Sequence, residues 1–580
     1  MGELIVSDVA RHHQLLVIGG GLAGLRAAVE AKAAGIDVAV LSQVHPARSH
    51  SGAAQGGINA ALANHPEGHD DTPMRHAFDT VKGSDYLADQ DAVVQMTADA
   101  PGVIFEMDHW GCPFSRFDDG RIAQRPFGGA GFPRTCYGAD KTGHYLLHCL
   151  VERAYQRQIT MYVEVFVTDL IVVDGVCRGV VAYDIVRGGF HAFTADAVIM
   201  ATGGAGRVYG NSTNAIISTG GGAAIAYHAG VPLKDMEFIQ FHPTGLLTSN
   251  ILMSEGARGE GGYLVNGSGE RFMARYAPKA MELAPRDITS RSIQTEILEG
   301  RGIDGKGYVY LDLRHLGAQK ILERLPGIRD LAIHFEHVDP IDEPVPVVPS
   351  QHYTMGGIDT DVDGRTQLGG FYAAGECACV SVHGANRLGG NSLLETIVFG
   401  RRAGAAAAQD LLGREVGASD DAVSTAARRD LAATEVRVAN LAVRGALGED
   451  PYAVRAEMKA TMKEHFGVFR EASQMREGLV KLQALKERCA DVGLRHNGGI
   501  FNLDLLRTLE LEGMVDVALA VAAGALRRTE SRGSHARTDY PARDDDAWLK
   551  HTLAYADGAD PRLEDKAVTL GTFEPQERTY

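Results

Sequence analysis

The sequence has few cysteines, and they do not cluster. Only seven of the 580 residues are cysteine, and Cys377-Ala378-Cys379 is the single close pair. Iron–sulfur clusters and structural zinc sites need about four thiolate or imidazole ligands at close spacing, so no metal site is expected in this chain. The scattered pattern instead predicts reduced and mostly buried thiols in a protein of an intracellular compartment.

Long apolar runs and basic runs are also missing. The most continuous apolar run near the end, Val517 to Leu526, is far shorter than the roughly 20 residues of a membrane-spanning helix. No secretory or twin-arginine signal is expected at the start. Lys and Arg number 57 against 74 Asp and Glu, a formal net charge of −17, which argues against nucleic acid as a partner. An anionic ligand would need a few arginines gathered in a pocket, and membrane attachment would need other subunits.

Glycine is abundant, with 69 residues, and its first cluster follows an apolar run. Leu15 to Ile18 is typical of a buried strand, and Gly19 to Gly24 fits the pattern G-x-G-x-x-G. A predicted helix from Leu22 to Ala34 and a predicted strand from Ile36 to Leu41 complete the β-α-β context that the motif requires. In this motif the first glycine permits the tight turn, the second lets the backbone approach a pyrophosphate, and the third lets the helix pack on the strand.

Two later segments repeat the strand-to-glycine pattern. They are Ala197 to Gly204 and Gly370 to Glu376, and each could be an ordinary strand and turn by itself. Together with the first turn they predict an extended FAD that crosses one sheet. The second predicted strand ends in Ser42-Gln43, without the acidic residue that often binds a ribose in this motif.

His50 lies in a small-residue loop, Ala-Arg-Ser-His-Ser-Gly-Ala-Ala-Gln-Gly-Gly, shortly after the first glycine turn. We interpret it as the point where the flavin is covalently attached, through an imidazole nitrogen and the 8α-methyl carbon of the isoalloxazine ring. Such a bond anchors the cofactor and tends to raise its potential, which allows oxidation of a saturated dicarboxylate. A lone histidine would more often be a surface residue, but the three glycine turns favour attachment here.

The chain also contains a series of long motifs, namely Arg48-Ser49-His50, Ala54-Gln55-Gly56-Gly57, Gln240-Phe241-His242-Pro243-Thr244-Gly245, Glu255 to Gly262, Arg286-Asp287, His352 to Gly357, Ala373 to Gly400, Glu530 to Gly533 and Trp548 to Thr552. In these motifs, and over nearly all its length, it resembles the flavoprotein subunit of succinate dehydrogenase and fumarate reductase, the complex II family.

The resemblance implies an α/β fold. An FAD-binding Rossmann-like domain carries an inserted α+β capping domain, and a helical domain and an irregular C-terminal domain follow. The expected boundaries are 1–238 and 352–415 for the FAD-binding domain, 239–351 for the capping domain, 416–526 for the helical domain and 527–580 for the C-terminal domain. The proline-rich stretch from Pro340 to Pro349 is predicted to be a stiff extended connector. A capping domain hinged at both ends would close over substrate.

The resemblance also implies which residues bind a small dicarboxylate. The substrate-binding positions are His242, Ser254, His352 and Arg387, together with Gln55 and Gly56. Arginine suits carboxylates because its planar fork donates two parallel hydrogen bonds. Ser254 stands where the family usually has threonine, and its hydroxyl can serve the same donor role.

The same resemblance implies the catalytic residues. Arg286 matches the family's proton-transfer arginine, Glu255 and Arg258 match the relay to solvent, and His242 is counted with them. A guanidinium holds its proton tightly, so Arg286 is easier to accept as an acid than as a base, unless neighbouring positive charge destabilises its protonated form. His242 or His352 as the proton group remains an alternative. Read alone, each histidine is typical of a satisfied core residue, and Glu255 with Arg258 of an ion pair on a helix surface.

The cofactor contacts implied by the resemblance are Gly19, Gly20, Gly21, Gly24, Ser42, Ser49, His50, Gly57, Ala201, Thr202, Gly203, Gly375, Glu376, Asn391, Ser392 and Leu393. The chain departs from the family at Gly221, where aspartate is usual, at Ser51-Gly52 and in the region from Gly128 to Tyr137, which looks short.

The implied activity is oxidation of succinate to fumarate with hydride transfer to covalent FAD. Electrons would pass to an iron–sulfur subunit. Membrane anchor subunits would place the chain on the inner face of the cytoplasmic membrane, or on the matrix side of the mitochondrial inner membrane. Gln55 resembles succinate dehydrogenases, whereas fumarate reductases commonly have glutamate there, so oxidation is favoured over fumarate reduction.

Two other classes of protein stay open at this point. A soluble relative such as an L-aspartate oxidase lacks the flavin-linking histidine and the matching C-terminal segment. A non-catalytic flavin electron-transfer module would have no reason to keep His242, Arg286, His352 and Arg387.

Overall fold

The structure, a computed structural model, describes residues 11–413 and 420–579. The predicted boundary between 415 and 416 lies outside these residues.

The described chain is organised around a seven-stranded sheet in the order β6-β2-β1-β9-β8-β7, with β16 also paired to β9. Its strands are β1 (Arg11–Ile18), β2 (Val38–Ser42), β6 (Thr160–Val163), β7 (Val165–Val173), β8 (Val176–Asp184), β9 (Phe190–Met200) and β16 (Phe371–Ala373). The strands β6, β2, β1, β9 and β16 are parallel to one another. Their carboxyl ends therefore meet at one edge, where ligands bind in open sheets of this kind.

Both faces of this sheet are covered, as parallel strands require. Alternate residues of β1 point to opposite faces: Leu15 and Val17 belong to one core and Leu16 and Ile18 to the other. The first core is formed with helices α1 (Leu22–Ala33), α3 (Gln90–His109), α4 (Thr142–Gln156) and α11 (Asn391–Leu412). The second includes α5 (Gly221–His228) and α15 (Leu503–Arg527).

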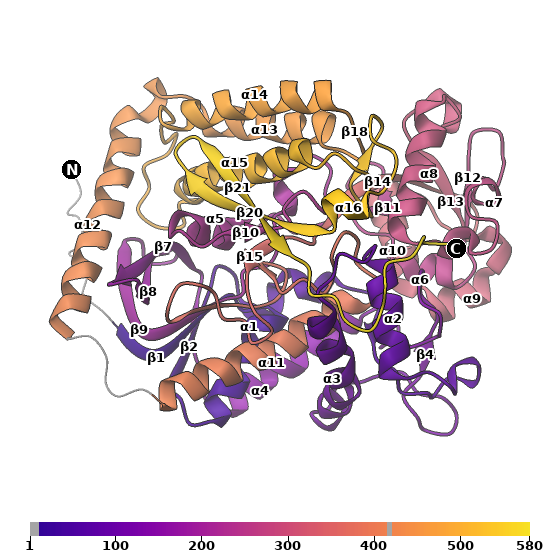
Figure 1. The fold of residues 1–580 in the computed structure, drawn as a ribbon, viewed down its shortest axis with the longest axis horizontal. Helices are drawn as coiled ribbons and strands as arrows, with labels where there is room; N and C mark the ends of the chain where they lie inside the picture. The colour runs from indigo at the N-terminus through magenta and orange to yellow at the C-terminus, as the bar shows by residue number, and fades with distance from the viewer. Residues whose placement is uncertain (1–10, 414–419, 580) are drawn as a thin grey trace.

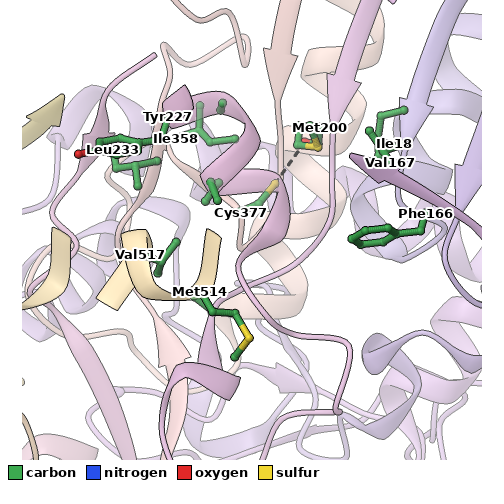
Figure 2. Packing of buried hydrophobic residues seen from close by; sticks show 14 of the residues in the cluster. Ile18, Phe166, Val167, Met200, Tyr227, Leu233, Ile358, Cys377, Met514 and Val517 are labelled. Atoms are coloured by element: carbon green, nitrogen blue, oxygen red, sulfur yellow. Dashed lines mark hydrogen bonds between the residues drawn. The ribbon is translucent and has the colours of Figure 1, made fainter. Parts of the chain in front are cut away.

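Figure 2 shows part of the second core. Ile18 and Met200 stand at the ends of two neighbouring parallel strands, and Met514 and Val517 of α15 lie in the same cluster. The Cys377 thiol donates to the carbonyl of Met200 at 3.3 Å, and burial raises its pKa to about 11. This cysteine is therefore a packing residue.

The segment after residue 238 forms its own sheet, in the order β11-β14-β13-β12. Its elements are β11 (Ile239–Leu246), α6 (Glu255–Gly259), β12 (Tyr263–Val265), α7 (Met273–Tyr276), α8 (Arg286–Leu298), β13 (Val309–Asp312), α9 (Ala318–Arg324), α10 (Pro326–Glu336) and β14 (Val345–Thr354). A separate core, including Leu264, Ile293 and Leu311, holds them together. These elements form the lobe at the right of Figure 1, which we call the capping lobe.

The proline-rich stretch is not the connector that we predicted. From Val345 onward it is β14, which pairs with both β11 and β13 and runs through the predicted boundary at 351/352 to Thr354. Proline lacks an amide donor, which made a strand look unfavourable from sequence. Here the carbonyl of Pro346 still accepts from the amide of Leu247 at 3.3 Å.

The helical region contains α12 (Asp420–Arg444), α13 (Pro451–His465), α14 (Ala472–Cys489) and α15. Within the described residues, no helix combines the length and the apolar character needed to cross a membrane.

The C-terminal segment is more regular than predicted. It holds α16 (Asp545–Trp548) and a hairpin of β20 (Lys550–Asp557) and β21 (Asp560–Ala567), which β10 (Leu233–Lys234) joins to β15 (Gly357–Asp359) and β17 (Ala378–Cys379). The strands that complete this sheet lie far away in sequence, so the local pattern did not reveal it. The tail then crosses to the capping lobe (Figure 1), where Arg578 pairs with Asp287 at 2.6 Å.

Apart from short 3-10 helices, the remaining helices and strands are short or peripheral. They are α2 (Pro73–Gly83), the three-stranded sheet of β3 (Ile58–Asn59), β5 (Thr135–Cys136) and β4 (Gln124–Arg125), and the pair β18 (Phe469–Arg470) and β19 (Ala536–Arg537).

We predict that Gly24→Ala destabilises the fold. An added Cβ at Gly24 would lie 1.9 Å from the carbonyl oxygen of Gly19, so helix α1 would have to move away from the strand. Overpacking of this kind costs roughly 1–3 kcal/mol or more, which should lower the melting temperature of the protein. The matched control is Gly102→Ala, in the exposed part of α3 with nothing within 4 Å. This change should stabilise by about 0.5–1 kcal/mol. Equal effects of the two substitutions would contradict the packing argument.

Candidate active site

One cavity of about 610 Å³ lies along the carboxyl edge of the main sheet and extends to the capping lobe. This size is within the range of ~300–1,000 Å³ that ligand pockets occupy. The turns after β1, β2, β9 and β16 all line it, as expected for parallel strands that end at one edge.

The first glycine turn is shaped by close backbone contacts. Gly19 has φ of +116°, and a Cβ there would lie 2.2 Å from the carbonyl oxygen of Ala201. Helix α1 begins at Leu22 with no side-chain cap and no acidic residue in its first turn. The amide of Leu22 donates to the hydroxyl of Ser51 at 3.3 Å, and the positive end of the helix dipole faces the cavity wall, where it favours an anion.

The cavity gathers most of the residues predicted for the site. Those in its lining are Gly19, Gly20, Gly21, Ser42, Ser49, His50, Gln55, Gly56, Gly57, Ala201, Thr202, Gly203, His242, Ser254, Glu255, Arg286, His352, Gly375, Glu376, Arg387, Ser392 and Leu393. Three predicted residues are not in the lining: Gly24 packs α1 on its strand, Arg258 lies behind Glu255, and the Asn391 side chain bonds to Asn59, His76 and Thr80.

His50 is held by the segment around residue 214. The backbone amide of Ala215 donates to its Nδ1 at 3.3 Å, and Nδ2 of Asn214 lies 3.2 Å from its Nε2. Burial, with the positive charge of Arg207, lowers the pKa of His50 to about 4. The imidazole is therefore neutral at physiological pH and keeps a lone pair for bond formation.

Two arginines meet at the other end of the cavity. Arg286, the first residue of α8, and Arg387 both donate to Oε1 of Gln240, at 3.1 and 3.0 Å. The Arg286 guanidinium also donates through Nε to Glu255 at 2.8 Å. Arg387 lies over the ring of Tyr353, 4.5 Å from its centre. Two positive groups thus face the same small space.

Two histidines complete this end of the cavity. The rings of His242 and His352 meet edge to face with centres 5.0 Å apart. Nδ1 of His242 accepts from the amide of Thr244 at 3.3 Å, so its proton is on Nε2, which is buried without a hydrogen-bond partner among the described residues. Burial, with the charges of Arg286 and other neighbours, holds the pKa values of both histidines well below the usual one. They are neutral donors.

The acidic groups at the cavity differ in charge. Burial alone would raise the pKa of Glu255, but the guanidinium groups of Arg286 and Arg258 hold it below its usual value. Glu255 is therefore ionised, and Arg258 lies 3.9 Å from it on the same short helix. At Glu376, by contrast, burial raises the pKa of the carboxyl group to about 8. Burial also acts on the nearby Arg387, where it lowers the pKa of the guanidinium group to about 9.

Ser254 precedes the helix that carries Glu255. Its hydroxyl oxygen accepts from the amide of Gly256 at 3.0 Å, as an N-cap does. The hydroxyl proton is then free to donate to a ligand in the cavity.

Two known protein families match parts of this chain. An FAD binding domain family matches residues 14–393, and a fumarate reductase flavoprotein C-terminal family matches 455–580. A fumarate reductase flavoprotein subunit of Mycobacterium tuberculosis is 46% identical over 98% of this chain and 99% of its own length. A succinate dehydrogenase flavoprotein subunit of Rickettsia conorii is 45% identical over 97% and 96%.

The chain belongs to the succinate dehydrogenase and fumarate reductase flavoprotein family.

Solved structures agree with this assignment. An E. coli quinol fumarate reductase FrdA structure superposes with a TM-score of 0.94 at 42% identity, covering 98% of this chain and 99% of that one. A Mycobacterium smegmatis Sdh1 structure gives 0.83 at 37% identity, covering 98% and 96%. The predicted α/β fold with an FAD-binding domain is therefore confirmed.

The cavity fits the FAD of this family. Several polar atoms at its wall are buried and have no hydrogen-bond partner among the described residues, namely Ser49 Oγ, Gln55 Oε1, Thr202 Oγ1, Asn214 Oδ1, His242 Nε2 and Arg387 Nε. Buried polar atoms are seldom left unsatisfied in proteins. Their arrangement from the glycine turns to the arginines matches a long polar ligand.

Gly221, where the family usually has aspartate, opens α5 beside the cavity. An added Cβ would meet only Oγ1 of Thr219, at 3.6 Å. The missing carboxylate therefore reflects no lack of space.

Some residues of the site were not found from sequence. Gln240 belongs to a motif that we quoted, yet only the structure shows it joining two arginines. Asn214 reaches His50 across 164 positions of sequence, and no local signal marks it. Arg125 donates through Nε to the carbonyl of Gly56 at 3.1 Å and stacks on Tyr137, which holds the loop around Gln55.

Proposed function

We propose that this protein is the catalytic flavoprotein subunit of a succinate:quinone oxidoreductase, which oxidises succinate to fumarate. The observation that carries the proposal is the meeting of Arg286, Arg387, His242 and His352 at one end of the FAD cavity. Two cationic forks and two neutral donors suit a small molecule with two carboxylates, because a carboxylate only accepts hydrogen bonds.

The residues that bind the substrate are of two kinds, a cationic anchor and neutral hydrogen-bond donors. Arg387 is the bidentate anchor, and the Nε2–H groups of the histidines and the hydroxyl of Ser254 are directed donors. Because the histidines are neutral, they orient the substrate without adding to the repulsion between the arginines. The pocket thus selects for two carboxylates at a short separation.

Arg286 is placed for the proton step. Its Nε–H points to the ionised Glu255 at 2.8 Å, so the guanidinium can give that proton to Glu255 and then take one from a substrate carbon. Arg258, 3.9 Å from Glu255, can accept the proton in turn after releasing one of its own. The histidines are weaker candidates, since their pKa values well below the usual one make them weak bases, and Nδ1 of each is already in a hydrogen bond.

A flavin bound in the cavity supplies the acceptor for the substrate's hydride. His50 would hold it by a bond from Nε2 to the 8α-methyl carbon. An imidazole alkylated at Nε2 keeps the lone pair of Nδ1, which accepts from the amide of Ala215 at 3.3 Å.

The direction of reaction rests on Gln55. Relatives of both names match this chain at similar identity, so overall similarity does not decide it. Gln55 lines the cavity with a neutral amide. A carboxylate there would disfavour electrons on a neighbouring acceptor, whereas the amide leaves its potential high enough to oxidise a saturated substrate.

We further propose that the chain works with an iron–sulfur subunit and membrane anchor subunits. The relatives above are named as flavoprotein subunits, and the E. coli relative as a quinol enzyme. Electrons from a flavin need a carrier to reach a quinone, and such subunits would hold the chain at the inner face of the cytoplasmic membrane or the mitochondrial inner membrane. Purification under mild detergent should recover these partners; recovery of the chain alone with full quinone reduction would contradict the proposal.

Two alternative functions are weaker. A soluble L-aspartate oxidase lacks both the linking histidine and the C-terminal segment, and that segment matches the fumarate reductase family here. An electron-transfer module would not need arginines and histidines gathered beside its flavin.

We predict a covalent flavin on His50. Acid-precipitated wild-type protein should keep flavin fluorescence at the size of the whole chain on a denaturing gel. His50→Ala should still bind FAD through the glycine turns but release it on denaturation. Loss of all flavin from precipitated wild-type protein would disprove attachment.

We predict that Arg286 and Arg387 fail in different ways. Arg286→Lys should lose turnover by about 100-fold or more, as expected for a positioned proton-transfer group, while a dicarboxylate still perturbs the flavin spectrum. Arg387→Ala should instead raise the dissociation constant of the dicarboxylate by about 30-fold or more, because a desolvated anion loses its paired cation. Near-normal turnover in Arg286→Lys would move the proton role to a histidine.

We predict that Gln55→Glu shifts the enzyme toward fumarate reduction. A carboxylate beside the flavin should disfavour the reduced state by roughly 1–2 kcal/mol at partly screened distances, which is about 20–40 mV for a two-electron couple. Potentiometric titration measures the shift, and dye-linked assays give the ratio of the two rates. Gln55→Met is the neutral control. An equal ratio in wild type and Gln55→Glu would contradict this account of direction.

A further inference from the structure

A turn at residues 211–215 lies against the end of β14, just where His352 begins to face the cavity. The amide of Thr213 donates to the carbonyl of Gln351 at 2.9 Å, and the amide of Gln351 donates to the carbonyl of Asn211 at 3.0 Å. Ser212 and Gln351 form a parallel bridge. The turn and the strand end are therefore fixed to each other.

The hydroxyl of Thr213 is the group nearest to the far side of the His352 ring. Its Oγ1 lies 2.7 Å from Nδ1 of His352 and 3.3 Å from the carbonyl oxygen of Gln351. That carbonyl also accepts the amide of Thr213 at 2.9 Å. Because the contact with Nδ1 is the shorter of the two hydroxyl contacts by 0.6 Å, we assign the single hydroxyl proton to the line to Nδ1.

This contact decides which nitrogen of His352 carries hydrogen. A neutral imidazole has one donor and one acceptor nitrogen, and the hydrogen bond at one nitrogen sets the tautomer at the other. With Nδ1 accepting from Thr213, Nε2 carries the proton. His242 has the same tautomer, set by the amide of Thr244. In the other tautomer, His352 would turn a lone pair toward a carboxylate and repel it.

We infer that Thr213 is a positioning residue that holds His352 in the Nε2–H tautomer for binding a substrate carboxylate. The inference rests on the proposed dicarboxylate function and adds a residue to it. Thr213 acts through His352 and does not itself need to touch substrate.

The experiment measures binding of malonate, a dicarboxylate that cannot be oxidised in the same way, to the FAD-loaded full chain through the change in flavin absorption. Thr213→Val keeps the shape but removes the hydroxyl, and should raise the dissociation constant by about tenfold, the scale of one lost hydrogen bond. Thr213→Ser restores the hydroxyl and should return the constant to within about twofold of wild type. The matched control is Ser212→Ala, which removes a hydroxyl of the same turn that bonds to Gln351 and to the amide of Asn214 but not to the His352 ring.

A double-mutant cycle separates positioning from general loosening of the turn. If Thr213 acts through His352, Thr213→Val should add nothing to the effect of His352→Ala, which is strong non-additivity between contacting residues. Succinate kinetics should show the loss mainly in KM, with a smaller change in kcat. Thr213→Ala serves as the second hydroxyl-free variant if the valine variant is not recovered folded.

The outcomes are distinct. Three results would overturn the inference while leaving the proposed function in place. They are additive effects of Thr213→Val and His352→Ala on malonate binding, wild-type affinity of Thr213→Val for malonate, and an equal loss of affinity in Ser212→Ala. Wild-type protein that binds no dicarboxylate would instead overturn the proposed function itself.

Discussion

The end of the cavity that contains Arg286 and Arg387 depends on these two buried guanidinium groups, which share one neutral hydrogen-bond acceptor. Arg286 and Arg387 both donate to the same oxygen of Gln240, and Glu255 bonds to Arg286. Buried charges that lack full compensation are costly. Burial, together with the charge of Arg286, lowers the pKa of Arg387 to about 9. The same two causes keep His242 and His352 neutral. A small dianion would supply the missing negative charge, which explains why the site would favour such a ligand.

Two parts of the fold contribute to this end of the cavity. Strands β11 and β14 and helices α6 and α8 carry His242, His352, Glu255 and Arg286, whereas Arg387 precedes helix α11 of the FAD-binding part. The charged groups face each other only when the capping lobe lies against the main sheet. The C-terminal tail ties the same lobe down, because Arg578 bonds to Asp287, the residue after Arg286, and also lies 3.3 Å from Asp85. The relative positions of these charged groups therefore depend on the position of the capping lobe.

The cofactor and substrate ends are linked by the turn at residues 211–215. Asn214 donates to the carbonyl of His352 at 2.9 Å and lies beside His50, and Thr213 bonds to the His352 ring. One short segment thus sets the surroundings of the histidine proposed to hold flavin and of a histidine proposed to bind substrate. A shift of this turn would disturb the contacts of both histidines, and its backbone hydrogen bonds with Gln351 hold it in place.

The sequence by itself determined the features that arise from short-range chemistry. The glycine turn after β1 was predictable because only glycine tolerates φ of +116° with a carbonyl 2.2 Å from the place of its Cβ, and the buried parallel strands followed from their apolar runs. Long motifs identified the family and most cavity residues. The tertiary structure alone decided that β14 is a strand, that the tail forms a hairpin paired to β10, and which groups bond to His50 and His352. The contacts of His50 with Asn214 and of His352 with Thr213 span 164 and 139 positions. Hydrogen bonds across such separations depend on how the chain packs, and no local pattern of residues encodes them.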